Sequence, residues 1–145
     1  MVSPIYIIAS ALLVAFLLGP IERVSRRASF ALMVLTLTAM AALSAVWLGL
    51  LAGGAEPYRI LTAGFAPPLS IALRMGVLEA ALSLLVTLAF LGSTPILAER
   101  FHRGGAAPKI LWLLMAMGAV GIVMTRDLFN LFVFLEIMAI ATYAM

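Results

Sequence analysis

Three ionisable side chains interrupt long apolar stretches of this 145-residue chain: Arg74, Glu79 and Glu136. A charged side chain at the centre of a bilayer costs about 2.5–3.5 kcal/mol even on the mildest insertion scale, so such residues are rare. They usually meet a polar partner and mark the pathway of an ion or a proton. These three positions are therefore the first candidates for a functional site.

Glu136 is the most informative of the three, because it lies inside the apolar stretch "DLFNLFVFLEIMAIATYAM". If a helix begins at Asp127, nine residues at a rise of about 1.5 Å place Glu136 about 13 Å deep, near the midplane of the bilayer. A lone carboxylate there would take up a proton, because desolvation disfavours its charged form. The position predicts a proton-translocating group. A structural carboxyl, hydrogen-bonded across a helix interface, is the alternative.

Arg74 and Glu79 are five residues apart, which on one helix separates them by about 140° around the axis. We therefore expect each to meet a different neighbour. Arg74, near the outer end of the predicted helix, can extend its side chain to the interface. Glu79 is either a second protonatable site or the partner of a basic residue elsewhere.

The remaining polar positions favour structural roles. Asp127 and Asn130 suit the start of a helix, where they cap free N–H groups, and Arg126 beside them is a candidate for an ion pair. His102 is interpreted as a solvated loop residue. The sequence contains no P-loop, G-x-G-x-x-G or H-E-x-x-H motif and no carboxylates at metal spacing, so we expect no cofactor and no metal.

The composition of the chain indicates the environment in which these side chains lie. Hydrophobic residues make up 66% of the chain and charged residues 10%, whereas a soluble domain has about half and a quarter. This is the profile of an integral membrane protein. There is no cysteine, which excludes disulfides and thiol chemistry. The net charge of +3 comes from short basic clusters between apolar runs, which are topology signals, so we expect the bilayer and no nucleic acid as a partner.

The hydropathy pattern predicts an all-α, multi-pass membrane protein with a single transmembrane domain. A span needs roughly 20 apolar residues. Five stretches qualify: 4–20, 30–52, 69–93, 108–124 and 127–145. The first has neither a basic start nor a cleavage site and is expected to be a retained helix. Residues 53–68, rich in Gly, Pro and aromatic side chains, are expected to lie in the membrane interface.

Lys and Arg are distributed unevenly between the alternate loops. The loops 21–29 and 98–109 carry six of them, whereas 53–68 and 125–126 carry only Arg59 and Arg126. Cytoplasmic loops are enriched in these residues, so the sequence predicts an outer N-terminus and a cytoplasmic C-terminus.

The final stretch resembles the fifth transmembrane helix of antiporter-like subunits of the complex I superfamily. The similarity is greatest to the D subunit of Mrp-type cation/proton antiporters and to related subunits of membrane-bound hydrogenases. In that family the D-L-F-N-L-F-V-F-x-E core carries a proton-translocating Glu, which corresponds here to Glu136. "GFAPPLSIALRMGVLEAALSLLV" resembles the third-helix entry of the family more weakly, with Gly76 where the family has Asp and Glu79 where it has Ser.

The resemblance also implies missing parts. Family members have about fourteen helices in two inverted repeats, whereas five are predicted here. The family's lysine partner of the Glu lies on a helix that this sequence lacks. The resemblance therefore implies that other membrane subunits, one of them supplying the missing helices and the lysine partner of Glu136, complete the site. The alternative is a short paralogue whose transport role is reduced or lost.

We accordingly expect a subunit of a multisubunit cation/proton antiporter or respiratory-type complex in a prokaryotic inner membrane. It would contribute to proton or sodium translocation through Glu136. A structural or assembly subunit without transport of its own is the alternative. If the complex is an enzyme, the chain belongs to the membrane arm of a redox-driven ion pump.

Overall fold

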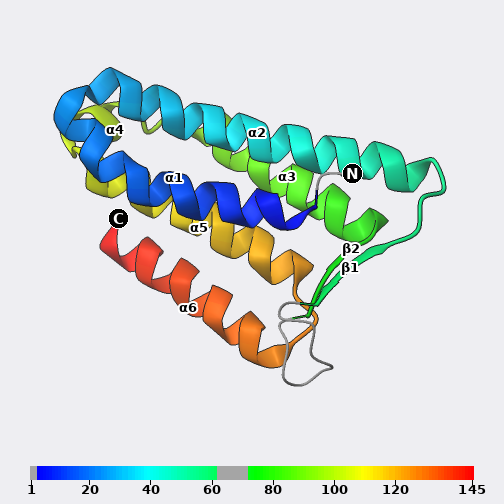
Figure 1. Ribbon diagram of the computed structural model, residues 1–145. Coiled ribbons are helices and arrows are strands. Elements are labelled where there is room, and N and C mark those ends of the chain that lie inside the picture. The colour runs from blue at the N-terminus through cyan, green and yellow to red at the C-terminus, as the bar shows by residue number, and fades with distance from the viewer. Residues whose placement is uncertain (1–2, 62–71) are drawn as a thin grey trace.

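The computed structural model describes residues 3–61 and 72–145 and is mostly helical (Figure 1). The predicted fold class, a helical multi-pass membrane protein, is confirmed. The described residues form these elements in order: α1 (Ile5–Val24), α2 (Arg26–Ala52), β1 (Tyr58–Leu61), β2 (Ala72–Met75), α3 (Val77–Ser93), α4 (Ala98–Arg103), α5 (Ala106–Met124) and α6 (Leu128–Ala144).

Four long helices pack around one core. α2 contacts α1 and α3, and α5 contacts the same two helices, so α1, α2, α3 and α5 close into a bundle. α6 packs on the outer side of α5 (Figure 1). The short helix α4 lies at one end of the bundle, and the strands β1 and β2 lie at the other.

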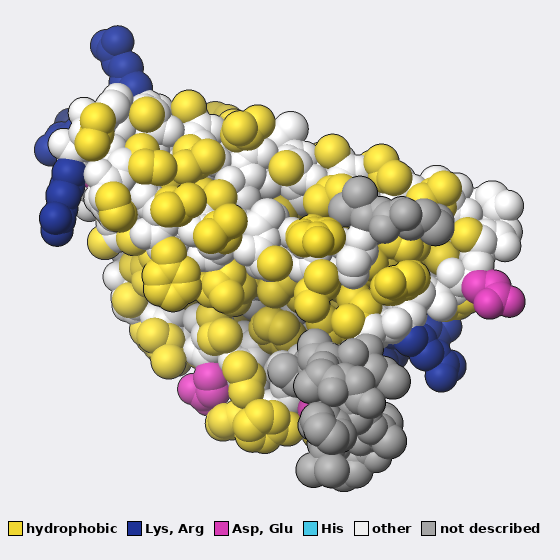
Figure 2. All heavy atoms as spheres, viewed as in Figure 1, with side chains coloured by type: hydrophobic (Ala, Val, Ile, Leu, Met, Phe, Trp, Pro, Cys, Tyr) yellow, Lys and Arg dark blue, Asp and Glu magenta, His cyan; other side chains and the backbone are white. Residues whose placement is uncertain are grey.

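The surface of the bundle suits hydrocarbon. α1, α2 and α5 are long and apolar enough to cross a membrane, while α3 and α6 are apolar but shorter. Figure 2 shows apolar side chains across the face of the bundle, and basic side chains projecting from the end where α1 meets α2. The number of spans and their orientation remain predictions.

The joint between α1 and α2 is tighter than expected. α1 continues through Pro20 to Val24, and α2 begins at Arg26, so Ser25 alone separates them. The Ser25 hydroxyl accepts a hydrogen bond from the backbone N–H of Ala28 and caps α2. Most of the predicted loop 21–29 is therefore helical.

The start of the third predicted helix, 69–93, differs from the structure, and its residues 69–71 lie outside the described part of the chain. Residues 72–75 form β2, which pairs antiparallel with β1, and α3 starts only at Val77. The backbone at Gly76 is extended and ends the strand. A short apolar run fits a strand as well as a helix, so hydropathy alone could not separate them. Of the predicted interfacial segment 53–68, residues 58–61 form β1, and residues 62–68 lie outside the described part of the chain.

The predicted loop 98–109 is also largely helical. α3 ends at Ser93, two residues before Pro95, and α4 follows at Ala98. Gly105, with a positive φ of 70°, separates α4 from α5, a conformation that glycine adopts without strain. The first turn of α5 therefore includes Lys109.

Two glycines let α6 approach α5 closely. A Cβ atom at Gly118 would lie 3.1 Å from the backbone oxygen of Phe134, and one at Gly121 would overlap the ring of Phe134. Small residues at helix contacts allow this proximity in membranes, where dispersion and hydrogen bonds hold helices together.

We predict that Gly121→Ala loosens the packing of α6 on α5, because the added methyl group meets the rigid ring of Phe134. Overpacking of this kind costs about 1–3 kcal/mol. Thermal unfolding in lipid nanodiscs measures it. Gly49→Ala in α2 is the matched control, since a Cβ there meets no described atom within 4 Å. Equal stability of both variants and wild type would contradict the prediction.

Candidate functional site

Glu136 lies in the middle of α6 with its side chain exposed on the surface of this chain. Within the described residues it forms no ion pair and no hydrogen bond through its carboxylate. α6 packs on α5 and lies at the edge of the bundle (Figure 1). The carboxylate is therefore available to a group outside the described chain.

The face of α6 that carries Glu136 is otherwise apolar. Four large side chains follow the helical spacing around it with exposed fractions of 60–92%: Phe129, Phe132, Ile140 and Tyr143. Residues three and four apart share one face of a helix, so Glu136 stands in the centre of this stripe. We call these five residues the α6 stripe. An apolar stripe of this length with a central acid fits contact with further membrane-embedded groups.

Glu79 forms an ion pair with a basic residue from another part of the chain, which is one of the two settings expected for it. It lies in the first turn of α3, where one carboxylate oxygen accepts the N–H of Gly76 at 3.0 Å. The other oxygen forms an ion pair with Arg126, just before α6. Glu79 is buried, while the Arg126 side chain is half exposed. The pair joins the start of α3 to the start of α6.

Arg126 also holds the hairpin through its backbone. Its N–H donates to the oxygen of Ala72 in β2 at 2.9 Å, and Leu73 bridges to Thr125 beside it. Asp127 caps α6 by accepting the N–H of Phe129 at 3.1 Å. β2, α3 and α6 therefore meet at one junction.

Arg74 is in β2 and not in a helix, so the helical angle between Arg74 and Glu79 does not apply. A Cβ atom at Gly76 would lie 3.6 Å from the Arg74 guanidinium and 2.6 Å from the Glu79 carboxylate. The two side chains are thus on the same side of the junction. The Nε atom of Arg74 is buried and has no hydrogen-bond partner in the described structure.

A buried ion pair that sequence reasoning missed joins α1 to α5. Lys109 is fully buried and donates to a carboxylate oxygen of Glu22 and, at 2.8 Å, to the hydroxyl of Ser29 in α2. The Ser29 hydroxyl in turn donates to Glu22. Arg26 lies farther away, with its Nε atom 3.9 Å from the other oxygen of Glu22. Three helices thus share one polar cluster inside an apolar bundle.

Glu22 and Lys109 both fall within predicted loops, 21–29 and 98–109. The extension of α1 past Pro20 and the early start of α5 bring them into helices. One signal was visible in the sequence. Lys109 falls in the first turn of a helix, where the positive end of the helix dipole disfavours a cation, so a nearby acid was needed.

No group of three or more His, Cys, Asp or Glu side chains in residues 3–61 and 72–145 is placed to hold a metal ion. Of the predicted site residues, the structure brings Arg74, Glu79, Arg126 and Asp127 to one end of the bundle. Glu136 is separate from them, eight residues along α6 from its first residue, Leu128.

The fold and these charges define a helical membrane protein with ionisable groups both inside the bundle and on an open helix face. The chain is 38% identical over 96 residues to NADH-quinone oxidoreductase subunit N of Desulforudis audaxviator (strain MP104C). The match covers 62% of this chain and 19% of the relative. No protein-family model matches the sequence.

A solved structure is also similar. A chain of the membrane-bound sulfane sulfur reductase, an archaeal respiratory membrane complex, matches with a TM-score of 0.82 and 26% identity over 98% of this chain. This chain spans 29% of that one and 19% of the bacterial relative. The resemblance to the complex I superfamily is thereby confirmed. The closer likeness to Mrp-type antiporters remains a prediction.

We predict that Lys109→Met destabilises the bundle, because Glu22 loses its buried ammonium partner and keeps only the Ser29 hydroxyl and the more distant, exposed Arg26. Removing one partner of a buried pair costs about 3–5 kcal/mol. The double variant Glu22→Leu, Lys109→Met should recover most of this loss, as measured by thermal unfolding in nanodiscs.

The exposed pair Glu99–Arg103 provides the control, since Glu99→Leu with Arg103→Met should change stability little. If the double variant in the cluster is as unstable as the sum of its single variants, Glu22 and Lys109 do not act as a pair.

We also predict that Arg126→Gln weakens the hairpin junction. Glu79 loses its ion pair but keeps the N–H of Gly76, so the expected cost is only about 1 kcal/mol for a half-exposed partner. Hydrogen exchange at the amides of β2 should become faster. Arg59→Gln in β1 is the control. If exchange at the β2 amides is unchanged in Arg126→Gln, the Glu79–Arg126 pair does not stabilise this strand.

Proposed function

We propose that this chain is a membrane subunit of a multisubunit respiratory-type complex or cation/proton antiporter. It contributes to proton or sodium translocation through Glu136, in the inner membrane of a prokaryotic cell. The similarity to subunits of a bacterial NADH-quinone oxidoreductase and an archaeal respiratory complex supports this class.

One observation carries the proposal: Glu136 differs from the other acids of the bundle. Glu22 and Glu79 are each paired with a cation of the same chain. Glu136 lies in the centre of the α6 stripe with no partner among the described residues. A group that must exchange protons or ions cannot be locked in a fixed pair, whereas a purely structural carboxyl is usually satisfied.

The partner of Glu136 comes from outside the described residues in this proposal. Both relatives are several times longer than this chain, so their extra helices are a source of contacts for the α6 stripe. The family resemblance favours a lysine on such a helix. The proposal is compatible with either sodium or the proton as the moving ion. It is equally compatible with an Mrp-type or a hydrogenase-type complex.

The chemistry follows from the position of the carboxyl. A carboxyl group in an apolar contact favours its neutral form, because burial disfavours the charged form. When a cation comes within about 4–6 Å, the carboxylate becomes favourable and the proton leaves. Movement of the partner toward and away from α6 thus converts a change of distance into uptake and release of a proton.

A structural or assembly role is the second candidate. The ion pairs Glu22–Lys109 and Glu79–Arg126 are fixed links between helices, and a third fixed pair through Glu136 would join this chain to a neighbouring subunit. The two candidate roles predict different effects on transport and assembly when the charge of Glu136 is removed.

We predict that Glu136→Gln abolishes coupled ion translocation by the assembled complex, because the amide cannot release a proton. Proteoliposomes with a pH-sensitive dye measure the translocation. Glu136→Asp should retain part of it. Glu56→Gln, which changes an exposed acid outside the helices, is the matched control and should leave it intact.

Assembly is measured on the same preparations by size and subunit content. A Glu136→Gln complex that assembles but does not transport supports the proposal. Transport at the wild-type rate would refute it. Loss of assembly in Glu136→Gln would favour the structural role.

A further inference from the structure

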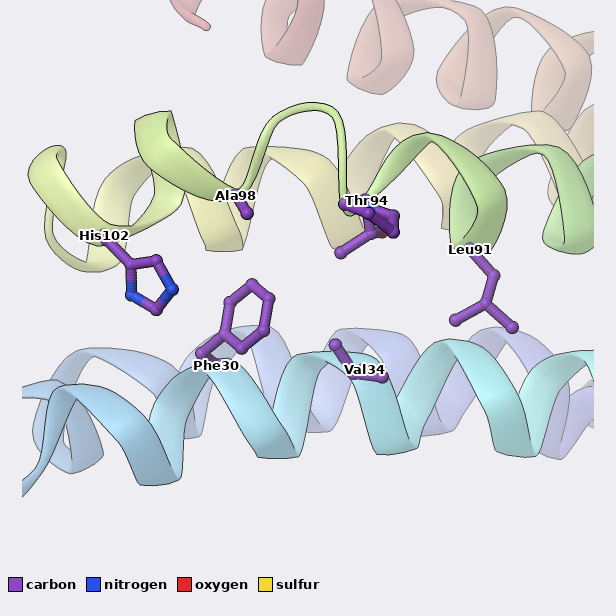
Figure 3. A pocket seen from close by; sticks show the side chains of 7 residues that line it. Phe30, Val34, Leu91, Thr94, Ala98 and His102 are labelled. Carbon is purple, nitrogen blue, oxygen red and sulfur yellow. The ribbon is translucent and has the colours of Figure 1, made fainter.

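The bundle has an apolar groove that neither the buried pairs nor Glu136 uses. It lies between α2 and the segment joining α3 to α4, and its volume is about 500 Å³ (Figure 3). The groove exists because α3 stops at Ser93 and the chain turns at Pro95 before α4 begins. α2 continues straight past this turn, so the two walls are not in full contact.

The walls of the groove change character along its length. Val34 and Leu91 line one end, and Phe30 and Ala98 follow toward the other, where His102 stands (Figure 3). The ring of His102 lies 4.9 Å from the ring of Phe30, centroid to centroid. One wall thus ends in a polar group that can donate a hydrogen bond into the mouth.

The other polar wall residue, Thr94, is already satisfied. Its hydroxyl donates to the oxygen of Phe90 at 2.8 Å and accepts from the indole N–H of Trp112 at 3.2 Å. The interior of the groove therefore offers only apolar contact. The polar group that can bind a ligand, His102, lies at the mouth of the groove.

Two basic residues of α2 lie beyond Phe30, toward the same end of the bundle as His102. Arg26 and Arg27 precede Phe30 by four and three residues on α2, so they lie on the same side of that helix, one turn farther out. Both are exposed, and Arg27 forms no ion pair within the described chain. This is the end of the bundle from which basic side chains project in Figure 2.

We propose that this groove binds one anionic phospholipid, with an acyl chain along Phe30 and Val34 and the phosphate between His102 and Arg27. The groove runs along the helix axes, as an acyl chain does in a bilayer. Basic pockets between membrane helices are suited to anionic head groups. The volume falls in the range of specific small-ligand sites.

The dimensions argue against a protein helix as the occupant. A docked helix is about 10 Å wide and uses side chains over two turns or more. On α2 the groove is lined only by Phe30 and Val34, which are one turn apart. A chain of methylene groups fits these limits.

The test is native mass spectrometry of the full complex, purified and mixed with dioleoyl phosphatidylglycerol or, separately, dioleoyl phosphatidylcholine. Wild type should retain one phosphatidylglycerol more than the Ala98→Phe variant, whose added ring fills the groove. Ala45→Phe, on an exposed position of α2, is the matched control and should retain the lipid.

The head-group contacts are tested by His102→Ala and Arg27→Gln. Each should weaken retention of phosphatidylglycerol about tenfold, as expected for loss of one charge-assisted contact. Arg59→Gln, at the opposite end of the bundle, should have no effect. Both variants change exposed side chains, so helix content by circular dichroism should equal that of wild type.

Three results would overturn the proposal. Equal retention by wild type and Ala98→Phe would show that the groove is not the site. Equal retention of phosphatidylcholine and phosphatidylglycerol would show that the basic mouth does not select the ligand. Loss of another subunit in Ala98→Phe, with an unchanged lipid count, would assign the groove to a protein contact.

Discussion

The structure depends on one physical constraint: the surroundings of its helices are apolar and do not solvate a charge. Each charge inside or against an apolar bundle needs a counter-charge or a hydrogen bond, since water is not there to solvate it. Glu22 meets Lys109, and Glu79 meets Arg126, each pair linking helices that are distant in the sequence. The bundle is held by apolar packing, and the Glu22–Lys109 pair joins α1 to α5, two helices that also pack against each other.

Glu136 is an exception, because it has no counter-charge among the described residues. Asp127 and Arg126 fix where its helix α6 begins, and Gly118 and Gly121 let α6 lie close against α5. The opposite face of α6 then carries the carboxylate outward. The same rule that pairs the other acids within the chain thus favours a partner for Glu136 beyond it.

The amino-acid sequence sufficed for the membrane class and the helical fold, because these follow from hydropathy. It did not suffice for the pairing of β1 with β2, since residues 72–75 form a strand only through their pairing with residues 58–61. Nor did it show the cluster around Lys109. Pro20 suggested a helix end, yet α1 continues through it, and only the packing of α1 on α5 brings Glu22 to Lys109.

Lys109 has a consequence for how the chain reaches its fold. Helices in a membrane are inserted first and pack afterwards, and a lysine that flanks a span helps to set the orientation of that span during insertion. After packing, the same ammonium group is fully buried against Glu22 and no longer faces the head groups. We therefore expect this side chain to contribute to orientation before the bundle closes and to stability afterwards, so its loss would affect insertion and stability at separate stages.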